Sequence, residues 1–549
     1  MSMKAMQIQG MTCEHCEKTV AEALVSAGAA SPQVSWRRGH AVFEAEDASD
    51  AQLTEAVQEA GYKVTSIKPE AKRPTTFEAL VGAKKHDYDL VVLGSGSAAF
   101  AAAIHATEAG ARVALMEANV VGGTCVNVGC IPSKAMLAPT ELLHRASHHP
   151  FDGIQRVTPG FDLGKLIDSK SELVDELRKE KYLDLADSYG FTVCRGLASF
   201  ADAESIDCNG ERVRAAKYII ATGASPAVPP IEGLKEAGFL TSTTALELRE
   251  VPKALAVIGA NAIGLEMGQL FMRLGAKVTF LEVAPRVTPL EEPETSQALT
   301  EVLEQDGASV LTGVKVIRVG REGASRIVTF QVGGKEQQLR VDRVLVATGR
   351  RPNTAGLGLD KAGIELTERG AVKVSDDLQT TNPRVWAAGA VAGHAQFVYV
   401  AAYEGNMASR NALEGAGRKV DFHSLPRVIF TSPSFAGAGL TDEQANAHGI
   451  ACECRVLPMS AVPRALVNRD TRGFVKIVAE ASSGKIVGAS MVADGAGEVI
   501  QSAVLAIQFG LTTDDIANTW APYLTFAEAF KLAAQTFKRD VSKLSCCAA

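Results

Sequence analysis

The stretch Leu90-Val-Val-Leu-Gly94-Ser-Gly96-Ser-Ala-Ala99 indicates the fold class of this chain. Its apolar start predicts a buried strand that runs straight into a helix. Gly94 permits the tight turn between the two, Gly96 lets the backbone approach a pyrophosphate, and Ala99 allows the helix to pack closely. The helix N-terminus would stabilise the phosphate charge. The stretch therefore predicts an α/β domain with a parallel sheet and a bound dinucleotide.

A second unit of the same kind starts at Leu255 and carries the loop Gly259-Ala-Asn261-Ala-Ile-Gly264. Asn261 stands where a second glycine is usual, and we expect it to be tolerated because asparagine adopts unusual backbone angles better than most residues. The strands after the two loops end in Glu117 and Glu282, acids that could hydrogen-bond a ribose. Two such units predict two dinucleotides, as in an enzyme whose flavin is reduced by a nicotinamide cofactor.

Between the two loops lies the segment Gly122-Gly-Thr-Cys125-Val-Asn-Val-Gly-Cys130-Ile-Pro-Ser-Lys134. The spacing of the cysteines predicts that both thiols lie on roughly one helical face, near enough for a disulfide. Gly129 and Pro132 are expected to bend the chain there. Because a thiol pair beside a flavin can accept two electrons and reopen to thiolates, the segment predicts a redox centre.

The composition is that of an ordinary globular chain. Its 549 residues are 46% hydrophobic and 22% charged, which predicts roughly three to five domains. The net charge of −7 gives no electrostatic support for a nucleic-acid partner. No stretch reads as a clean membrane span or a secretory signal, so we expect a cytoplasmic protein.

Ten cysteines in such a compartment do not indicate a disulfide scaffold. Close pairs instead indicate metal-binding or redox sites. Cys452 and Cys454 form a looser pair that we interpret as structural or incidental, and the isolated Cys194 and Cys208 are interpreted in the same way.

Residues 1–68 predict a small separate domain with the ferredoxin-like order strand–helix–strand–strand–helix–strand. Its first loop, Gly10-Met-Thr-Cys13-Glu-His-Cys16, resembles the heavy-metal-associated domain, and the helix N-terminus would lower the pKa of both thiols. The flanking residues Met11 and Thr12 argue against a thioredoxin-type motif. Residues 69–86, rich in Lys, Pro, Thr and Glu, predict a linker.

Beyond residue 86 the chain resembles the FAD-dependent pyridine nucleotide-disulfide oxidoreductases, the family of lipoamide dehydrogenase, glutathione reductase and mercuric reductase. The cysteine segment carries the resemblance, and further matches are Ala221-Thr-Gly-Ala-Ser-Pro226, Ala347-Thr-Gly-Arg-Arg-Pro-Asn353 and Val385-Trp-Ala-Ala-Gly389. The resemblance implies two Rossmann-like domains and an α+β dimerisation domain. Their expected ranges are FAD-binding 87–232, NAD(P)-binding 233–351, a return of the FAD-binding part at 352–424, and dimerisation with a Cys-Cys tail at 425–549.

The resemblance also implies roles for single residues. Cys130 corresponds to the flavin-proximal thiol, Cys125 to the interchange thiol, and Lys134 to a lysine near the flavin that pairs with Glu266. Where this chain has Ala390, the family usually has an aspartate that binds the flavin ribityl chain, so we expect flavin to bind through the other contacts and less tightly. The cofactor-binding residues implied are Gly94, Gly96, Ala99, Glu117, Gly123, Thr124, Lys134, Thr222, Gly223, Gly259, Gly264, Glu282, Gly349, Arg350, Gly389 and Ala390.

Two tyrosines and the C-terminal tail resemble the branch of the family that reduces mercuric ion. Tyr523 stands where the disulfide-reducing members carry a histidine acid/base, and Tyr182 matches a second active-site tyrosine of the mercury-reducing members. Cys546 and Cys547 are poor partners for a disulfide but good ligands for a soft metal. A merely exposed tail, or a relay like that of large thioredoxin reductases, is the alternative reading.

The resemblance thus implies a homodimeric enzyme that reduces Hg(II) to Hg(0) with NAD(P)H through FAD and the cysteine pair. Hg(II), free or as a thiol complex, would be collected by Cys13 and Cys16 or by the tail, and mercury transport or carrier proteins are possible partners. The metal-binding set implied is Cys13, Cys16, Cys125, Cys130, Cys546 and Cys547.

Three alternatives stay open at this stage. The family resemblance favours NADPH as the electron donor. The acidic Glu282 favours NADH, and the nearby positive charge of Arg286 would counter that preference. A lipoamide- or glutathione-type disulfide reductase is one rival function. A soft-metal chaperone or sensor with a vestigial flavin part is the other.

Overall fold

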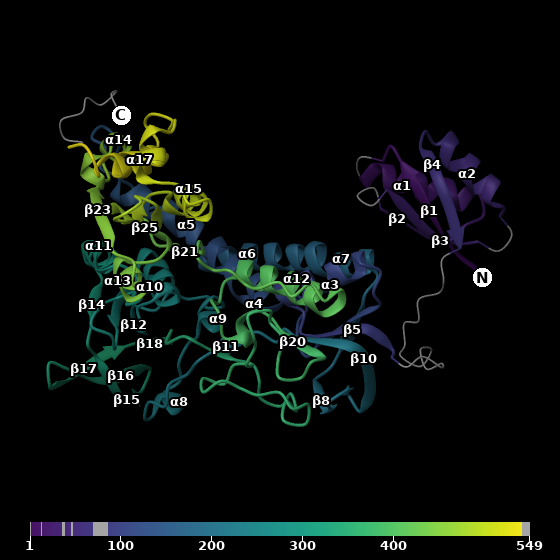
Figure 1. Cartoon of the computed structure of the whole chain (residues 1–549), viewed down its shortest axis with the longest axis horizontal. Helices are drawn as coiled ribbons and strands as arrows, with labels where there is room; N and C mark the ends of the chain where they lie inside the picture. Colours follow the sequence, from purple (N-terminus) through teal and green to yellow (C-terminus); the bar gives the residue numbers. More distant parts are fainter. Residues whose placement is uncertain (1, 12–13, 36–38, 46–47, 70–85, 541–549) are drawn as a thin grey trace. The chain divides into compact units, whose positions relative to one another are not determined.

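The computed structural model describes residues 2–11, 14–35, 39–45, 48–69 and 86–540, which belong to two compact units, Met1–Asp87 and Tyr88–Ala549 (Figure 1). Almost all of the expected linker, 69–86, lies outside the described residues.

The first unit has the expected ferredoxin-like order, with β1 (Ser2–Gln9), α1 (Glu14–Ser26), β2 (Ala30–Ser35), β3 (His40–Ala45), α2 (Asp50–Glu59) and β4 (Lys63–Pro69). The strands form an antiparallel sheet in the order β2-β3-β1-β4. Val20 and Leu24 of α1, and Leu53 and Val57 of α2, are fully buried in its core because they recur at helical spacing on one face. The Ser49 side chain caps the start of α2.

The first sheet of the second unit follows from the Leu90–Ala99 pattern. Its parallel strands are β5 (Tyr88–Leu93), β6 (Val113–Glu117), β7 (Thr192–Arg195), β10 (Glu211–Ile220) and β20 (Val385–Ala387), and β8 (Ala198–Asp202) and β9 (Ser205–Cys208) continue it antiparallel. The helices α3 (Ser97–Glu108) and α12 (Val398–Glu414) lie so close that a Cβ on Gly405 would stand 2.1 Å from the carbonyl oxygen of Ala98. The loops after β5, β10 and β20 meet at the carboxyl edge of this sheet, where α/β proteins bind ligands.

The second sheet is the other predicted dinucleotide unit. Its parallel strands lie in the order β14 (Ser309–Leu311), β13 (Lys277–Leu281), β12 (Ala254–Ile258) and β18 (Arg343–Val346). The accompanying helices are α10 (Ala262–Arg273) and α11 (Pro293–Gln305), and β15 (Lys315–Glu322), β16 (Ser325–Val332) and β17 (Lys335–Val341) form an antiparallel sheet beside it. A short ladder between β11 (Ala224–Pro226) and β19 (Arg350–Pro352) marks where the chain leaves the first sheet region and returns to it.

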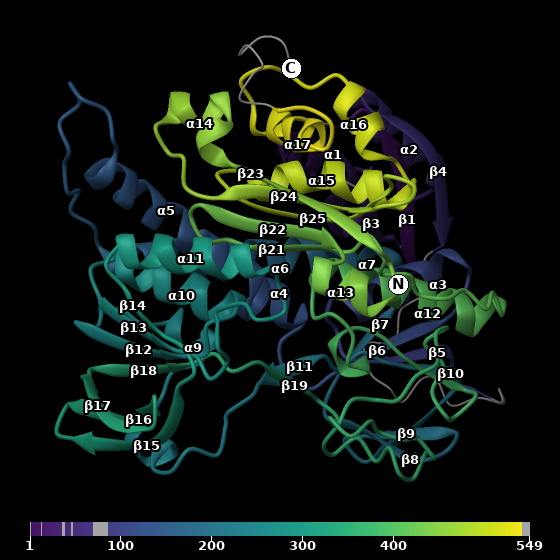
Figure 2. The same cartoon turned by 60° about the vertical axis from the view of Figure 1, so that its left-hand side comes forward.

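The third sheet is antiparallel, in the order β21 (Pro426–Ile429), β22 (Ser434–Gly439), β25 (Ile486–Ala493), β24 (Phe474–Glu480) and β23 (Cys452–Pro458). Both of its faces are covered. Phe474 and Val492 pack into the core around α10, whereas their neighbours Val475 and Met491 pack against α15 (Ala496–Gln508) and α17 (Phe526–Gln535). Figure 2 shows these two helices, in yellow, over the green sheet.

The remaining helices connect these sheets. They are α4 (Gly123–Val128), α5 (Cys130–His148), α6 (Leu163–Arg178), the π-helical turn η2 (Lys179–Leu183), α7 (Asp184–Tyr189), α8 (Leu234–Ala237), α9 (Ser242–Ala245), η3 (Ala390–Ala392), α13 (Asp442–Ala447), η4 (Met459–Ala461), α14 (Pro463–Asn468) and α16 (Thr513–Asn518). Within the described ranges, no helix is long and apolar enough to cross a membrane.

Candidate active site

The two central cysteines lie on either side of a helix break. Cys125 is inside α4, and Cys130 is the first residue of the 19-residue helix α5. Gly129 between them has φ −125° and ψ −110°, and a Cβ there would stand 2.9 Å from the carbonyl oxygen of Thr124. The bend expected at Gly129 is confirmed, and because the chain changes direction there, the expectation of one helical face for both thiols was wrong. The thiols nevertheless meet: they are free, half-buried and hydrogen-bonded to each other.

The surroundings make the two sulfurs unequal. A hydrogen bond from the Cys125 thiol, helped by the charge of Lys134, lowers the pKa of Cys130 to about 6. The N-terminal end of α5 acts in the same direction, since helix N-termini stabilise thiolates. The same hydrogen bond and burial raise the pKa of Cys125. At neutral pH Cys130 is thus a thiolate, and Cys125 is the thiol that donates to it.

Lys134 lies one turn after Cys130 on α5, which puts the two on the same side of the helix. Its Nζ is 2.7 Å from Oε2 of Glu266, a residue of α10 whose side chain is 8% exposed. The other carboxylate oxygen, Oε1, accepts the backbone N–H of Phe430 at 3.0 Å, and Lys134 Nζ lies 4.3 Å from the Phe430 ring centre. The pair implied by the resemblance is present as an ion pair that joins α5, α10 and the end of β21.

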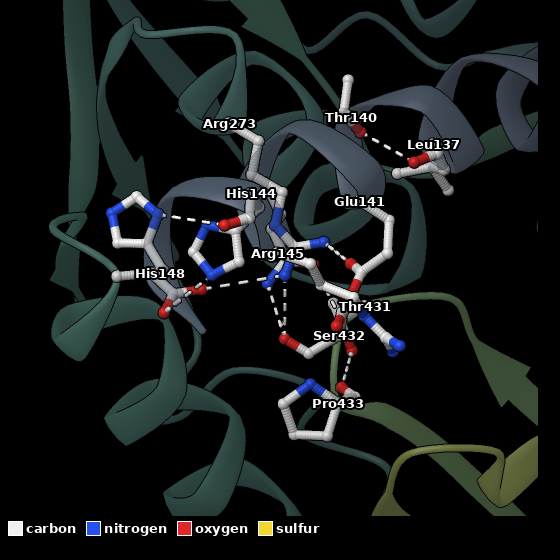
Figure 3. Close-up of polar contacts among 12 residues, drawn as sticks. Leu137, Thr140, Glu141, His144, Arg145, His148, Arg273, Thr431, Ser432 and Pro433 are labelled. Carbon is white, nitrogen blue, oxygen red and sulfur yellow. Dashed lines mark hydrogen bonds and ion pairs between the residues drawn. The ribbon is translucent and has the colours of Figure 1, made fainter. Parts of the chain in front are cut away.

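A second ion pair holds the far half of α5 (Figure 3). Arg273, 3% exposed, pairs with Glu141 and donates to the carbonyl oxygen of Ser432 at 3.2 Å. Lys134 and Glu141 are seven residues apart on α5, and Glu266 and Arg273 are seven apart on α10. The two helices are thus joined twice, two turns apart, with the signs of the charges exchanged.

Asp306 and two histidines complete this charged cluster. Asp306 lies 3.9 Å from Arg273 Nη2 and 4.0 Å from His144 Nε2, and the His144 ring stacks on His148 with 4.4 Å between ring centres. Burial, followed by the charge of Arg273, lowers the pKa of His144. His144 is therefore neutral at neutral pH, and the positive charges of the cluster come from Arg273, from Arg145 beside Glu141 and from Arg472 beside Asp306.

Tyr182 comes close to the thiols because a π-helical turn extends α6. The turn η2 inserts at Lys179–Leu183, and π-turns of this kind often occur at functional sites. The Tyr182 ring packs edge-on against Phe100, with 4.8 Å between ring centres. Burial raises the pKa of Tyr182, and the charges of Cys125 and Cys130 raise it further, whereas a hydrogen bond with Ser97 opposes the shift.

Two further side chains, those of Tyr399 and Arg350, lie near Cys130. Burial raises the pKa of Tyr399 to about 12, with a contribution from Cys130, and its hydroxyl donates to the carbonyl oxygen of Pro426 at 2.5 Å. The sequence analysis missed Tyr399, because nothing in its spacing along the chain links α12 to α5. Arg350, which was predicted, lies near the Cys130 charge and donates to Thr124 Oγ1 at 3.3 Å.

The carboxyl edge of the first sheet is shaped for a close-lying ligand. Gly94 has φ +113°, and a Cβ there would stand 2.4 Å from the carbonyl oxygen of Ala221. Cβ atoms on Gly223 and Gly349 would meet nothing within 4 Å, so the backbone at these loops is bare. Ser95 Oγ donates to Glu117 at 2.5 Å, which holds that acid beside the loop. Bare backbone and the N-terminus of the 12-residue helix α3 fit the pyrophosphate of FAD.

Other predicted cofactor residues line the same edge. Ala99 is fully buried in α3, and a Cβ on Gly123 would lie 2.6 Å from the Cα of Gly96, so the two glycine turns touch. Thr222 Oγ1 donates to the carbonyl oxygen of Asn353 at 2.7 Å and joins the loop after β10 to the returning chain.

At the position of the missing aspartate, Ala390 follows Gly389 and starts η3. The carboxylate at this turn comes from elsewhere: the buried Glu404 of α12 accepts the Gly389 N–H at 2.6 Å and pairs with His394 Nδ1 at 2.7 Å. The sequence analysis did not single out Glu404, which lies at the turn only because α12 folds back over it.

The second loop is also a tight turn, although not for the expected reason. A Cβ on Gly259 would stand 2.5 Å from the carbonyl oxygen of Ala347, and one on Gly264 would stand 2.0 Å from that of Gly259. Asn261 has φ −105° and ψ −172°, ordinary extended angles, so tolerance of unusual angles is not what it contributes. It acts as the N-cap of α10, since its Oδ1 accepts the Ala262 N–H at 2.8 Å.

The two residues expected to compete for the nicotinamide ribose are both engaged within their own loops. Glu282 is 7% exposed, and its carboxylate accepts the N–H groups of Ala260 at 2.6 Å and Ala284 at 2.8 Å. Arg286 donates to the carbonyl oxygens of Glu291 at 2.6 Å and Pro289 at 2.8 Å.

The remaining predicted residues are spread over the chain. Tyr523, 47% exposed, lies on the loop before α17 in the third-sheet region, where Leu524 has φ +59°. Cys16 is 9% exposed near the start of α1. Cys13, Cys546 and Cys547 lie outside the described residues.

Comparison with known proteins identifies two family matches within the second unit. Residues 88–405 match the family described as pyridine nucleotide-disulphide oxidoreductase, and residues 425–534 match its dimerisation domain. The chain is 48% identical to a mercuric reductase of Staphylococcus aureus over 98% of both chains. It is 49% identical to one of Streptomyces lividans over 84% of this chain and 98% of that protein. It resembles the solved structure of the HOCl-induced flavoprotein disulfide reductase RclA of Escherichia coli at TM-score 0.74 and 31% identity, covering 82% of this chain and 100% of that one.

Proposed function

The chain belongs to the pyridine nucleotide-disulphide oxidoreductase family, and from that premise we propose that it is an enzyme that reduces Hg(II) to Hg(0) with electrons from NAD(P)H. The observation that carries the proposal is the near-full-length similarity to proteins named mercuric reductase, at 48% identity over 98% of both chains. The overall reaction balances as NAD(P)H + Hg(II) → NAD(P)⁺ + H⁺ + Hg(0). FAD, when bound, carries the two electrons from NAD(P)H toward the thiols.

The dithiol supports this reaction by its asymmetry. The Cys130 thiolate is ready to bind a soft cation at neutral pH, because its pKa is lowered to about 6. Cys125 then loses its proton to become the second ligand. Lys134 keeps a positive charge beside the sulfurs, and Glu266 holds that lysine in place. Elemental mercury binds thiolates weakly and leaves the site after the electrons arrive.

The position of Tyr523 disfavours a disulfide substrate. A disulfide reductase needs an acid/base to protonate the leaving thiolate, and this chain has a phenol at that place in the sequence. Reduction of a metal ion needs no such proton transfer. A chaperone or sensor with an idle flavin part is likewise disfavoured, since the dithiol and the Lys134–Glu266 pair are intact.

Delivery of the ion forms a second part of the proposal. Cys13 and Cys16, on a domain of residues 1–68, collect Hg(II), and Cys546 and Cys547 pass it to Cys125 and Cys130. The match to a dimerisation domain supports a homodimer, and we propose that the tail serves the active site of the other subunit. Carrier proteins that hand over Hg(II), and a cytoplasmic location, belong to the same proposal.

The trans arrangement of the tail can be tested by mixing two defective chains. One carries Cys125→Ala with Cys130→Ala, and the other carries Cys546→Ala with Cys547→Ala. Heterodimers should regain turnover in excess glutathione, because one intact core meets one intact tail. Verified heterodimers without recovered turnover would contradict delivery in trans.

The function itself is tested by an anaerobic assay of NAD(P)H oxidation with three acceptors: Hg(II), lipoamide and glutathione disulfide. We expect sustained oxidation with Hg(II) and little with the disulfides. Turnover with a disulfide that exceeds turnover with Hg(II) would assign the chain to the disulfide reductases instead.

A further inference from the structure

A second pair of thiols lies outside the proposed site, on β23 of the third sheet. Cys452 and Cys454 are two residues apart on one strand, so their side chains emerge on the same face. The two Sγ atoms are 3.9 Å apart, and both cysteines are free and half-buried. The sequence alone favoured a structural or incidental role for this pair, whereas the two sulfurs lie side by side.

Polar groups of α13 lie around the pair. Cys452 Sγ is 3.8 Å from Oδ1 of Asn446 and 3.9 Å from the carbonyl oxygen of Asp442. Within the described chain β23 pairs only with β24, so the pair lies at an edge of the sheet. Burial raises the pKa of Cys454 to about 12, which keeps it protonated and slow toward oxidants at neutral pH.

We propose that Cys452 and Cys454 form a second metal site, which binds one soft, two-coordinate cation such as Hg(II) or Cu(I). Thiolates select such ions by their softness. Two thiolate–metal bonds of about 2.3 Å each span roughly 4.6 Å in a linear arrangement, and the present 3.9 Å reaches this by small side-chain rotations. Binding of Hg(II) displaces both thiol protons: Hg(II) + 2 RSH → Hg(SR)₂ + 2 H⁺.

A site with only two thiol ligands should bind Zn²⁺ poorly. Zn²⁺ in structural sites takes four ligands, usually Cys or His, and no group of three or more His, Cys, Asp or Glu side chains suited to a metal occurs in the described residues. The pair lies on the third sheet, whereas Cys125 and Cys130 lie on α4 and α5. The proposal for β23 is binding of the ion alone, with no electron transfer to it. This inference does not depend on the proposed function, because binding needs no turnover.

The test uses the full chain with FAD bound and six cysteines changed to alanine: Cys13, Cys16, Cys125, Cys130, Cys546 and Cys547. This protein is loaded with Hg(II), washed with excess glutathione and assayed for retained mercury. We expect about one Hg per chain, because only a chelating dithiol withstands the monothiol wash. Cu(I) should be retained in the same way, and Zn(II) should wash off. Retention of no Hg(II) by this background would overturn the site.

Matched variants then locate the ion. Adding Cys452→Ser or Cys454→Ser should lower retention about tenfold or more, because a single thiolate is a monodentate ligand. Adding Cys194→Ser, at another half-buried strand cysteine, should change nothing. Retention unchanged by Cys452→Ser would also overturn the site. If a serine variant loses its FAD, alkylation of the background protein decides: bound Hg(II) should protect Cys452 and Cys454, and unprotected thiols would contradict the proposal.

Discussion

The cysteine pairs on α4–α5 and on β23 share a residue type and differ in what surrounds them. Cys130 starts a long helix beside Lys134, and its pKa is lowered to about 6. Cys454 lies on an edge strand where burial raises its pKa to about 12. The first pair holds a thiolate at neutral pH, whereas Cys454 of the second pair keeps its proton until a strongly bound cation displaces it. The hydrogen bond from Cys125, helped by Lys134, lowers the pKa of Cys130, and burial raises that of Cys454; these surroundings distinguish the two thiol pairs.

The largest contrast should appear in turnover. Cys130→Ser should lower Hg(II)-dependent NAD(P)H oxidation by about 1000-fold or more, because the thiolate that binds the ion is lost. Cys452→Ser should leave the rate within about twofold, as expected for a residue outside a catalytic unit. Both rates are measured anaerobically at equal FAD content. A comparable loss in both variants would place the β23 pair in the reaction.

The next contrast concerns how α5 is held. Arg273→Leu should leave the half-buried Glu141 carboxylate with only the more exposed Arg145 as its partner and lower the free energy of unfolding by about 2 kcal/mol. Arg249→Leu, which removes an exposed ion pair with Asp168, is the matched control and should change stability far less. Chemical denaturation of the FAD-bound protein measures both. Equal effects would show that the cluster of Figure 3 does not anchor α5.

Alkylation against pH compares the two pairs directly. In the reduced protein the rate at Cys130 should rise with pH through a midpoint near its pKa of about 6, because the thiolate forms above that value. The rate at Cys454 should keep rising toward a pKa of about 12. At pH 7 Cys130 should react roughly 100-fold faster, allowing for its weaker intrinsic nucleophilicity. Peptide mass spectrometry after timed quenching measures the two sites separately. Similar alkylation rates at Cys130 and Cys454 at pH 7 would contradict the difference in pKa between them.

The smallest expected effect comes from removing only the charge of Lys134 near Cys130. Lys134→Met should raise the Cys130 midpoint by about one pH unit, since the lysine favours the thiolate. Lys373→Met, at an exposed lysine paired with Glu365, should leave the midpoint in place. A midpoint unmoved by Lys134→Met would leave the hydrogen bond from Cys125 and the helix N-terminus as the causes of the low pKa.

The sequence predicted what is encoded locally. The strand–loop–helix units at Gly94 and Gly259, and the ferredoxin-like order of the first unit, follow from apolar periodicity and glycine spacing. The thiol pair was found from its spacing, and the pairing of Lys134 with Glu266 came from the family resemblance. These features depend on residues close together in the chain, or on a pattern that the family shares.

The features that the sequence did not predict depend mostly on contacts between segments that are far apart in the chain. The π-turn at Tyr182 arises without an unusual composition. Tyr399 and Glu404 lie near the site only because α12 packs against α3. The carboxylate of Glu282 points to its own loop rather than outward. No spacing rule reports such contacts, because each depends on two segments that meet only after folding.

The most direct test of the central claim counts mercury atoms against electrons. The full-length protein, with FAD, is given Hg(II) and a limiting amount of NADPH or NADH under anaerobic conditions, and the Hg(0) carried off by a gas stream is measured. The balanced reaction requires one Hg(0) released for each nicotinamide oxidised, and none from the Cys125→Ala, Cys130→Ala variant. Nicotinamide oxidation without release of Hg(0), or equal release from that variant, would contradict the account.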